Sequence, residues 1–445
     1  MKLFSHTELE NAVIYEVNIR NYSEEGNIRA FEKDLNVLKE LGVKIIWIMP
    51  VQSISLTKRK AGSGKLIEEI SDTEERKKVL GSPYSISDYR AVNPDLGTMD
   101  DFKKLVKSAH ELGMFVILDW VADHTGWDHR WTELCPEFYY KNEKGEITEP
   151  LDYSTGKPVG WDDVAHLNYD NKQLWAAMYS NMEFWLKETD IDGFRCDVAD
   201  MVRLDFWEFA VRKLNEVKPV FMLAESDHKD YLEMAFSVGY DWKIHHIMNE
   251  IAAGRKNVRE LDEMIEWEIK NYPREITFMR FTSNHDENAW KGSAVKRLGD
   301  AAEVFAALSY MLPGLPLIYN GQEYDLSKEL RFFEKDVIQK QTGKMFPVYK
   351  ALGKLKNENP ALNGGIKKAG YHRRRTSDDE NILFFSREKN GHILYFIANL
   401  SSENRKFSIE LEGVFENFMP GIIHLWNGIE LEFAPWQYWI LSPKK

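Results

Sequence analysis

Cysteine is almost absent from this chain, which has two, Cys135 and Cys196, among 445 residues. Two cysteines so far apart cannot build the framework of a small disulfide-stabilised secreted fold. Long apolar runs are also missing, since no stretch approaches the ~20 residues that span a bilayer. The first residues, MKLFSHTELENAVIYEV, contain no apolar run typical of a signal peptide. We therefore expect a cytoplasmic protein in a reducing compartment, with no membrane as partner.

Positive charge is in deficit as well. The 58 Lys and Arg residues against 71 Asp and Glu residues give a formal net charge of −13. This balance disfavours nucleic acid and anionic membranes as partners and leaves a neutral substrate open. Aromatic residues, in contrast, are abundant, with 14 Trp, 19 Tyr and 24 Phe. A chain of this length is expected to fold into two or three domains.

Eight short apolar stretches alternate with segments of helical periodicity. The helical segment 28–41 separates the apolar stretches 12–17 and 44–50, and a strand–helix–strand opening predicts a parallel sheet. Further strands are predicted at 114–120, 193–197, 220–225, 236–241, 276–281 and 315–319. Eight strands alternating with helices predict a closed (β/α)8 barrel of the TIM type. The competing fold, a doubly wound open sheet, would carry a Gly-rich phosphate motif that this chain lacks.

Two long segments interrupt the alternation. Residues 51–83 are rich in glycine and charge and predict an exposed loop with a charged helix near 68–79, although their place after the second strand could make them a wall of a cleft. Residues 124–171 predict an inserted subdomain after the third strand. The barrel is then expected to comprise 1–123 and 172–365. Helical periods disappear after that, and 366–445 predicts a separate antiparallel β-sandwich domain.

The stretch GFRCD, residues 193–197, is the first candidate for chemistry. Arg195 and Asp197 are two residues apart, so both side chains point to the same side of the predicted strand. A neighbouring guanidinium favours the ionised form of a carboxyl group. An ionised Asp197 held in this way could act as a nucleophile. An ordinary ion pair explains the pentapeptide equally well.

Polar residues end several predicted strands, at the rim where barrels of this kind carry their active sites. They are Asp119, Asp123 and His124 after the third strand, Arg195 and Asp197 at the fourth, Glu225 at the fifth, and His285 and Asp286 after the seventh. The three carboxylates Asp197, Glu225 and Asp286 could bind a metal or act on a glycosidic bond. The second chemistry needs one ionised and one protonated carboxyl group, a natural pair of roles for Asp197 beside Arg195 and for Glu225.

These residues lie in motifs that resemble, in order, those of the α-amylase family of glycoside hydrolases. The motifs are LDWVADH (118–124), GFRCD (193–197), LAE (223–225) and NHD (284–286), with additional similarity at 167–168 and 42–50. The resemblance covers nearly the whole chain. It implies a retaining hydrolase that cleaves α-1,4 bonds of starch-derived polymers or maltooligosaccharides through a covalent glycosyl-enzyme. Alternatives are a transglycosylase, an α-glucosidase or cyclomaltodextrinase on the same scaffold, and a catalytically silent carbohydrate-binding relative.

The resemblance also implies roles for single residues. Asp197 would be the nucleophile, Glu225 the general acid and then base, and Asp286 a stabiliser of the transition state. The substrate-binding set would be Tyr84, His124, Arg195 and His285. No cofactor would be required for the chemistry.

A structural calcium ion at Asp123 is a further expectation from the resemblance. Asp123 stands where the family usually has Asn, and Asp200-Met201 replaces a Lys-His pair that often follows the second motif. Asp could still ligate calcium, because this hard cation takes oxygen donors.

Overall fold

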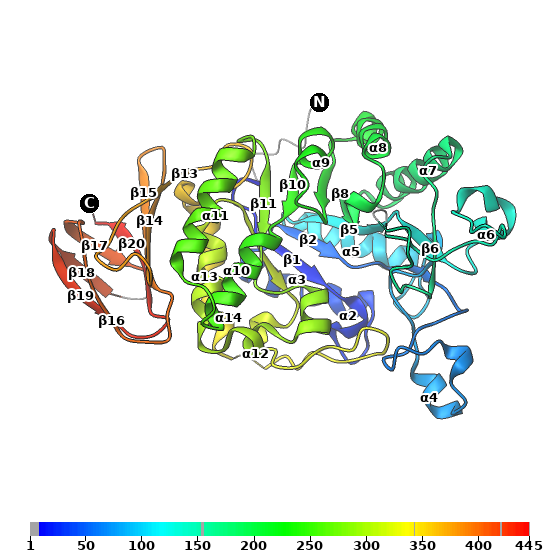
Figure 1. Ribbon diagram of the computed structural model, residues 1–445, viewed down its shortest axis with the longest axis horizontal. Coiled ribbons are helices and arrows are strands. Elements are labelled where there is room, and N and C mark those ends of the chain that lie inside the picture. Colours follow the sequence, from blue (N-terminus) through cyan, green and yellow to red (C-terminus); the bar gives the residue numbers. More distant parts are fainter. Residues whose placement is uncertain (1–8, 153–154, 342, 419–420, 445) are drawn as a thin grey trace.

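The computed structural model describes residues 9–152, 155–341, 343–418 and 421–444. A barrel occupies its centre, with antiparallel sheets at the C-terminal end of the molecule and an extension that carries β6 and α6 at the other end (Figure 1). Residues 1–8, part of the stretch examined for a signal peptide, lie outside the described residues. Among the helices that are described, none is long and apolar enough to cross a membrane.

The barrel consists of eight parallel strands. They are β1 (Ile14–Val17), β2 (Ile45–Ile48), β5 (Phe115–Val121), β8 (Gly193–Asp197), β9 (Phe221–Ala224), β10 (Val238–Tyr240), β11 (Thr277–Arg280) and β12 (Leu315–Tyr319). They close in the order β1-β12-β11-β10-β9-β8-β5-β2. Side chains on both faces of these strands are buried, which is why the strands appear in the sequence as continuous apolar runs. The prediction of a (β/α)8 barrel is confirmed.

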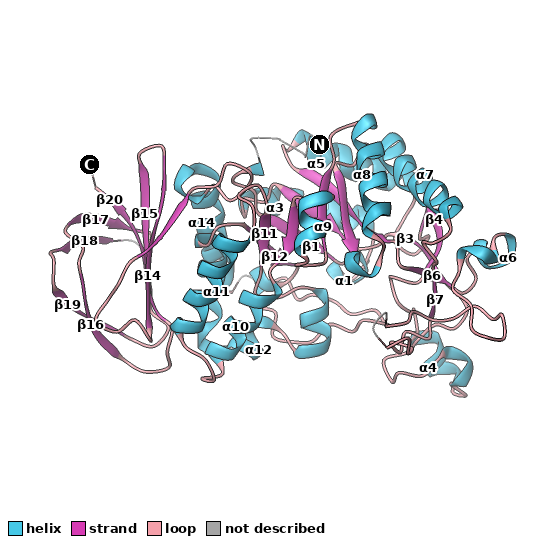
Figure 2. Cartoon of the chain, turned by 45° about the horizontal axis from the view of Figure 1, so that its top comes forward, coloured by secondary structure: helices cyan, strands magenta, loops and turns pink. Residues whose placement is uncertain are grey.

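Helices surround the barrel (Figure 2). They are α1 (Ile19–Tyr22), α2 (Ile28–Glu32), α3 (Leu35–Glu40), α5 (Met99–Glu111), α7 (Lys172–Thr189), α8 (Leu204–Val217), α9 (Lys229–Met234), α10 (Trp242–Ala252), α11 (Val258–Asn271), α12 (Ala294–Leu298), α13 (Ala302–Met311) and α14 (Met345–Glu358). The single helix predicted over 28–41 is wrong. At Asp34 the backbone N–H bonds to the Phe31 carbonyl, and this tighter turn separates α2 from α3.

Two excursions leave the carboxyl ends of barrel strands. The first follows β2, where β3 (Gln52–Ile54) pairs antiparallel with β4 (Ile86–Val92) and the segment between them carries the short helix α4 (Thr73–Lys78). The second follows β5 and contains β6 (His124–Gly126), α6 (Trp131–Leu134) and β7 (Val164–His166), with β6 and β7 paired antiparallel. Both excursions therefore lie at the end of the barrel where the predicted site residues are.

The C-terminal part is antiparallel, as predicted. Its strands are β13 (Gly370–Arg373), β14 (Ile382–Lys389), β15 (His392–Asn399), β16 (Arg405–Ile409), β17 (Gly413–Asn417), β18 (Gly421–Leu425), β19 (Ile429–Phe433) and β20 (Tyr438–Pro443). Six of them form a sheet in the order β13-β14-β15-β20-β17-β18, and β16 pairs with β19. Phe384, Ile397, Phe407 and Phe433 belong to the buried apolar cluster of this part.

Candidate active site

Arg195, in the middle of β8, is the centre of the acidic cluster. Its side chain is fully buried. Nη1 donates to Asp119 Oδ1 at 2.9 Å and to Asp197 Oδ1 at 2.8 Å, and Nη2 lies 2.8 Å from Glu225 Oε2. Nε donates to the hydroxyl of Tyr240 at 3.0 Å. One buried cation thus contacts three carboxylates from three neighbouring strands, which offsets the cost of burying it.

The start of β8 requires glycine. A Cβ atom on Gly193 would lie 1.9 Å from the carbonyl oxygen of Phe221 in β9. The two strands can approach this closely only because Gly193 has no side chain. The resulting register pairs Arg195 with both Asp119 of β5 and Leu223 of β9. The glycine therefore helps to set the position of the cation among the carboxylates.

Asp119 is a buried member of the cluster that links it to aromatic side chains. Its Oδ2 accepts hydrogen bonds from Trp47 Nε1 and from the Tyr84 hydroxyl, both at 3.0 Å. Burial raises the pKa of Asp119 to about 6, although the charge of Arg195 opposes the shift. Asp119 thus holds the rings of Trp47 and Tyr84 around Arg195, whose guanidinium carbon lies 4.9 Å from the Trp47 ring centre.

Glu225 follows β9 and faces the nucleophile candidate. Burial raises its pKa to about 8, and the charges of Asp197 and Asp286 act in the same direction against that of Arg195. Its Oε2 accepts a hydrogen bond from the backbone N–H of Val198 at 2.8 Å. Val198 has a φ of +36°, a left-handed conformation that is rare for a β-branched residue. This conformation directs the N–H of Val198 toward Glu225. Backbone strain of this kind clusters at functional sites.

His285 and Asp286 enter from the segment after β11. His285 Nδ1 lies 2.6 Å from Glu16 Oε1, and Nε2 lies 2.8 Å from the Tyr84 hydroxyl and 3.2 Å from Asp286 Oδ2. Burial disfavours the charged imidazole, but Asp286 and Glu16 outweigh it and raise the pKa of His285 to about 9. The imidazole stacks on the Tyr84 ring, with 5.3 Å between ring centres. Asp286 keeps a side chain that is 35% exposed, in contrast to its buried neighbours.

These groups open into one pocket with a volume of about 640 Å³. This size is within the range of small-molecule sites. The sequence-predicted residues that line it are Tyr84, His124, Asp197, Glu225, His285 and Asp286. Arg195 and Asp119 lie beneath it, fully buried. The structure therefore brings all the predicted catalytic and substrate-binding residues together around one pocket, with Arg195 as their support.

Asp123, the candidate calcium ligand, lies between two histidines. His124 Nδ1 is 3.2 Å from its Oδ2, and His166 Nε2 is 3.4 Å from its Oδ1. Burial opposes ionisation, but these two histidines outweigh it and lower the pKa of Asp123. Calcium takes six to eight oxygen donors, and the described residues contain no group of three or more His, Cys, Asp or Glu side chains arranged to hold a metal. The side chains that contact Asp123 thus present nitrogen atoms to it, and the calcium site remains a prediction.

Several contributors to the pocket were not assigned from the sequence. Glu16 is the next-to-last residue of β1 and holds His285, and a charged residue within a buried apolar strand was a signal available for it. Trp290, Phe332 and Phe333 line the pocket from segments after β11 and β12. These segments have no regular periodicity, so nothing in the sequence indicated that their rings meet. The pocket is thus lined by more aromatic surface than the motifs alone indicate.

The family model described as alpha amylase, catalytic domain, matches residues 4–146 and 159–254, more than half of the chain. This chain belongs to the alpha-amylase family of glycoside hydrolases and related transferases. Among curated relatives, "Alpha-amylase 3" of Dictyoglomus thermophilum is 26% identical, with 71% of this chain aligned to 64% of that protein. Two other relatives are an "Alpha-1,4-glucan:maltose-1-phosphate maltosyltransferase" of Picrophilus torridus, at 24% identity, and a "4-alpha-glucanotransferase" of Thermotoga neapolitana, at 25% identity. The alignments to three curated relatives span 64%, 44% and 63% of their length.

Solved structures agree with the family over nearly the full chain. An alpha-amylase of Lactobacillus plantarum is 30% identical with a TM-score of 0.84, and 98% of this chain aligns to 100% of that one. A noncanonic maltogenic alpha-amylase of Thermotoga neapolitana is 27% identical, also with a TM-score of 0.84, over 98% of this chain and 99% of that one.

Proposed function

We propose that this protein is a retaining α-glucan hydrolase that cleaves α-1,4-glucosidic bonds of starch-derived polymers or maltooligosaccharides. The observation that carries the proposal is the shared contact of Arg195 with Asp197 and Glu225, at 2.8 Å each, beneath a pocket that both carboxylates line. A nucleophile and an acid on one support can act on the same bond. Membership of the alpha-amylase family supports the same reaction class.

The first step forms a covalent glycosyl-enzyme. The Asp197 carboxylate attacks the anomeric carbon as the bond to the leaving oxygen breaks, and Glu225 gives that oxygen its proton. The raised pKa of Glu225, about 8, supports this role because the acid is still protonated at neutral pH. Asp286 is the third carboxylate and stabilises the positive charge that develops on the sugar ring.

The second step releases the sugar. Glu225, now a carboxylate, takes a proton from water, and the water oxygen attacks the anomeric carbon. The bond to Asp197 breaks and its carboxylate is restored. Two inversions at one carbon give net retention of configuration. The Tyr84 ring and the imidazoles of His124 and His285 border the space for this sugar.

Transfer to a sugar hydroxyl in place of water is the second candidate. It is favoured by the relatives that are named glucanotransferases, at 25% identity. Incubation with maltotetraose separates the two activities. We expect glucose, maltose and maltotriose at early times if water is the acceptor, as measured by chromatography of quenched samples. Oligosaccharides longer than maltotetraose as the main early products would instead establish a transferase.

The pH dependence of kcat/KM is expected to show an alkaline limb near pH 8. Glu225 must be protonated to act as an acid, and its pKa is raised to about 8. Each pH unit above that value lowers the fraction of protonated acid about tenfold. Initial rates with maltotetraose between pH 5 and pH 10 measure this limb. A rate that stays constant up to pH 10 would contradict Glu225 as the acid.

A further inference from the structure

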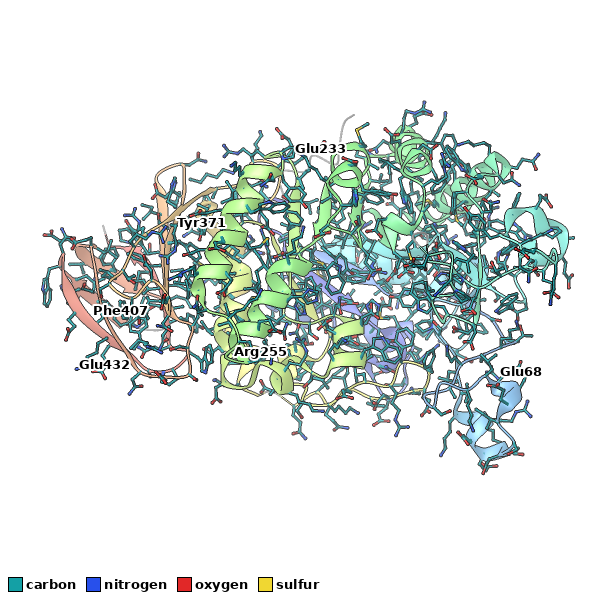
Figure 3. All side chains as sticks on the ribbon, in the orientation of Figure 1. Glu68, Glu233, Arg255, Tyr371, Phe407 and Glu432 are labelled. Carbon is teal, nitrogen blue, oxygen red and sulfur yellow. The ribbon has the colours of Figure 1, made fainter. Side chains whose placement is uncertain are left out.

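The segment between β3 and β4 is a folded lobe rather than a loose loop. We call residues 55–81 the hairpin lobe. Its backbone turns back at Gly62–Gly64, where the Ala61 N–H bonds to the Lys65 carbonyl, and its apolar side chains Ala61, Ile67, Ile70 and Val79 form a small buried core. The helix α4 has no buried residue and projects away from the barrel (Figure 1). Figure 3 shows the lobe residue Glu68 at the same outer end.

One side of the hairpin lobe is fastened to the excursion after β5. Lys60 Nζ lies 2.6 Å from Asp162 Oδ1 and donates to the Gly160 carbonyl at 2.9 Å. The side chain of Lys60 is only 17% exposed, so this ion pair is partly shielded from water. Lys58 Nζ lies 3.5 Å from the ring centre of Trp127. These contacts join the lobe to two separate points of the excursion.

The other side of the hairpin lobe contacts the segment after β12. The N–H groups of Leu80 and Gly81 both bond to the Phe333 carbonyl, at 3.0 and 3.1 Å. At the tip, a Cβ atom on Gly62 would lie 3.4 Å from Glu334 Oε1. The lobe therefore bridges two excursions that leave the barrel far apart in sequence. Its residues Lys60, Gly62 and Gly64 line the pocket beneath this bridge.

The bridge stands on the Tyr84 side of the pocket. Tyr84 lies three residues after the end of the lobe, and its ring is stacked parallel to that of Phe332 with 6.1 Å between ring centres. Glu225, which must reach the leaving oxygen, is held by Arg195 of β8 and by the backbone N–H of Val198, the residue after β8. If the leaving group of a sugar between Asp197 and Tyr84 lies toward Glu225, the rest of the glycone extends away from Glu225, toward the lobe residues that line the same pocket.

We propose that the hairpin lobe closes the glycone end of the cleft, so that the enzyme attacks α-glucans from their non-reducing ends and releases short products. This inference rests on the proposed function and adds the direction and the mode of attack. An open groove would let a chain extend past the bond on both sides. A wall of Lys60, Gly62, Phe332 and Phe333 limits the number of sugar units beyond Tyr84. Only the non-reducing end of a glucan can then place a glycosidic bond at Asp197.

The test compares two forms of p-nitrophenyl maltoheptaoside, one free and one blocked at its non-reducing end by an ethylidene group. We expect the free form to be cleaved about 100-fold faster, because a blocked end that cannot enter the pocket leaves the reacting bond out of line. Products are identified by chromatography. Equal rates on the two forms, or attack from the reducing end, would overturn this inference and leave the hydrolase function standing. Cleavage of neither form, nor of maltotetraose, would overturn the proposed function itself.

Variants of the lobe add a second measurement. Lys60→Met removes the ion pair with Asp162 and is expected to raise the relative rate on the blocked form. Lys65→Met, at an exposed position just after the turn of the same lobe, is the matched control and should leave the ratio of the rates on the free and blocked forms unchanged. Replacing residues 57–79 by a short Gly–Ser linker should bring the ratio of the rates on the free and blocked forms close to one. If that deletion does not fold, the wild-type ratio and the two lysine variants still decide the matter, and an unchanged ratio in Lys60→Met would count against the fastening role of Lys60.

Discussion

Asp197→Asn is expected to lower kcat on maltotetraose about 10⁶-fold, the scale on which loss of a covalent nucleophile is measured in other enzymes. An amide cannot form the glycosyl-enzyme, because its nitrogen and oxygen are poor nucleophiles. The geometry should persist, because the Asn carbonyl oxygen can still accept a hydrogen bond from Arg195 Nη1. In the wild type this nitrogen lies 2.8 Å from Asp197 Oδ1. Arg195 also keeps Asp119 and Glu225 as charge partners. The measurement is the initial rate of product formation by the purified variant.

The control for this variant is Asp300→Asn, which makes the same change on an exposed residue. It should retain wild-type turnover. Thermal unfolding of both variants, followed by circular dichroism, checks that each is folded. Near-normal turnover of a folded Asp197→Asn enzyme would remove Asp197 from the role of nucleophile.

Glu225→Gln is expected to lower kcat on maltotetraose about 10³- to 10⁴-fold, because both the acid and the base of the two steps are lost. The effect should depend on the leaving group. Maltosyl fluoride needs little protonation to leave, so its first step should persist while the second, which needs the base, is slow. The glycosyl-enzyme then accumulates on Asp197. Intact-protein mass spectrometry after mixing with maltosyl fluoride measures this as a gain of one maltosyl unit.

Two variants make this readout specific. Glu410→Gln carries the same substitution on an exposed residue and should behave as the wild type. The double variant Asp197→Asn/Glu225→Gln should gain no mass, since the nucleophile is absent. If Glu225→Gln lost activity on maltosyl fluoride as fully as on maltotetraose, Glu225 would be needed for more than proton transfer, and its assignment as the acid would have to be revised.

Much of the barrel was readable from the sequence because its signals are local. Each strand is buried on both faces, so apolar runs such as 44–50 and 315–319 stand out from the helices between them. The candidate site residues were readable for the same reason. Asp197, Glu225 and Asp286 each lie at or just beyond the end of such a run, and the carboxyl ends of parallel strands in a barrel meet at one rim.

Features that depend on contacts between distant segments were not readable. The break at Asp34 within the predicted helix 28–41 accompanies an ion pair of Asp34 with Lys340, 306 residues away. The stacking of Phe332 on Tyr84 joins two irregular segments that have no periodic pattern. The segment 51–83 was predicted as a loop, with a possible role as a cleft wall, but its own core and its contacts with Asp162 and Phe333 follow only from the packed fold.

The sequence by itself determined the barrel, the order of the acidic residues around its rim and the family to which the chain belongs, because these depend on strand pattern and motif spacing. Only the tertiary structure decided the environment of each carboxyl group. Burial raises the pKa of Glu225 to about 8, and the carboxylate of Asp123 lies between two histidines. Desolvation and close charge pairs arise from segments that meet in three dimensions, and neither can be computed from the spacing of residues along a chain.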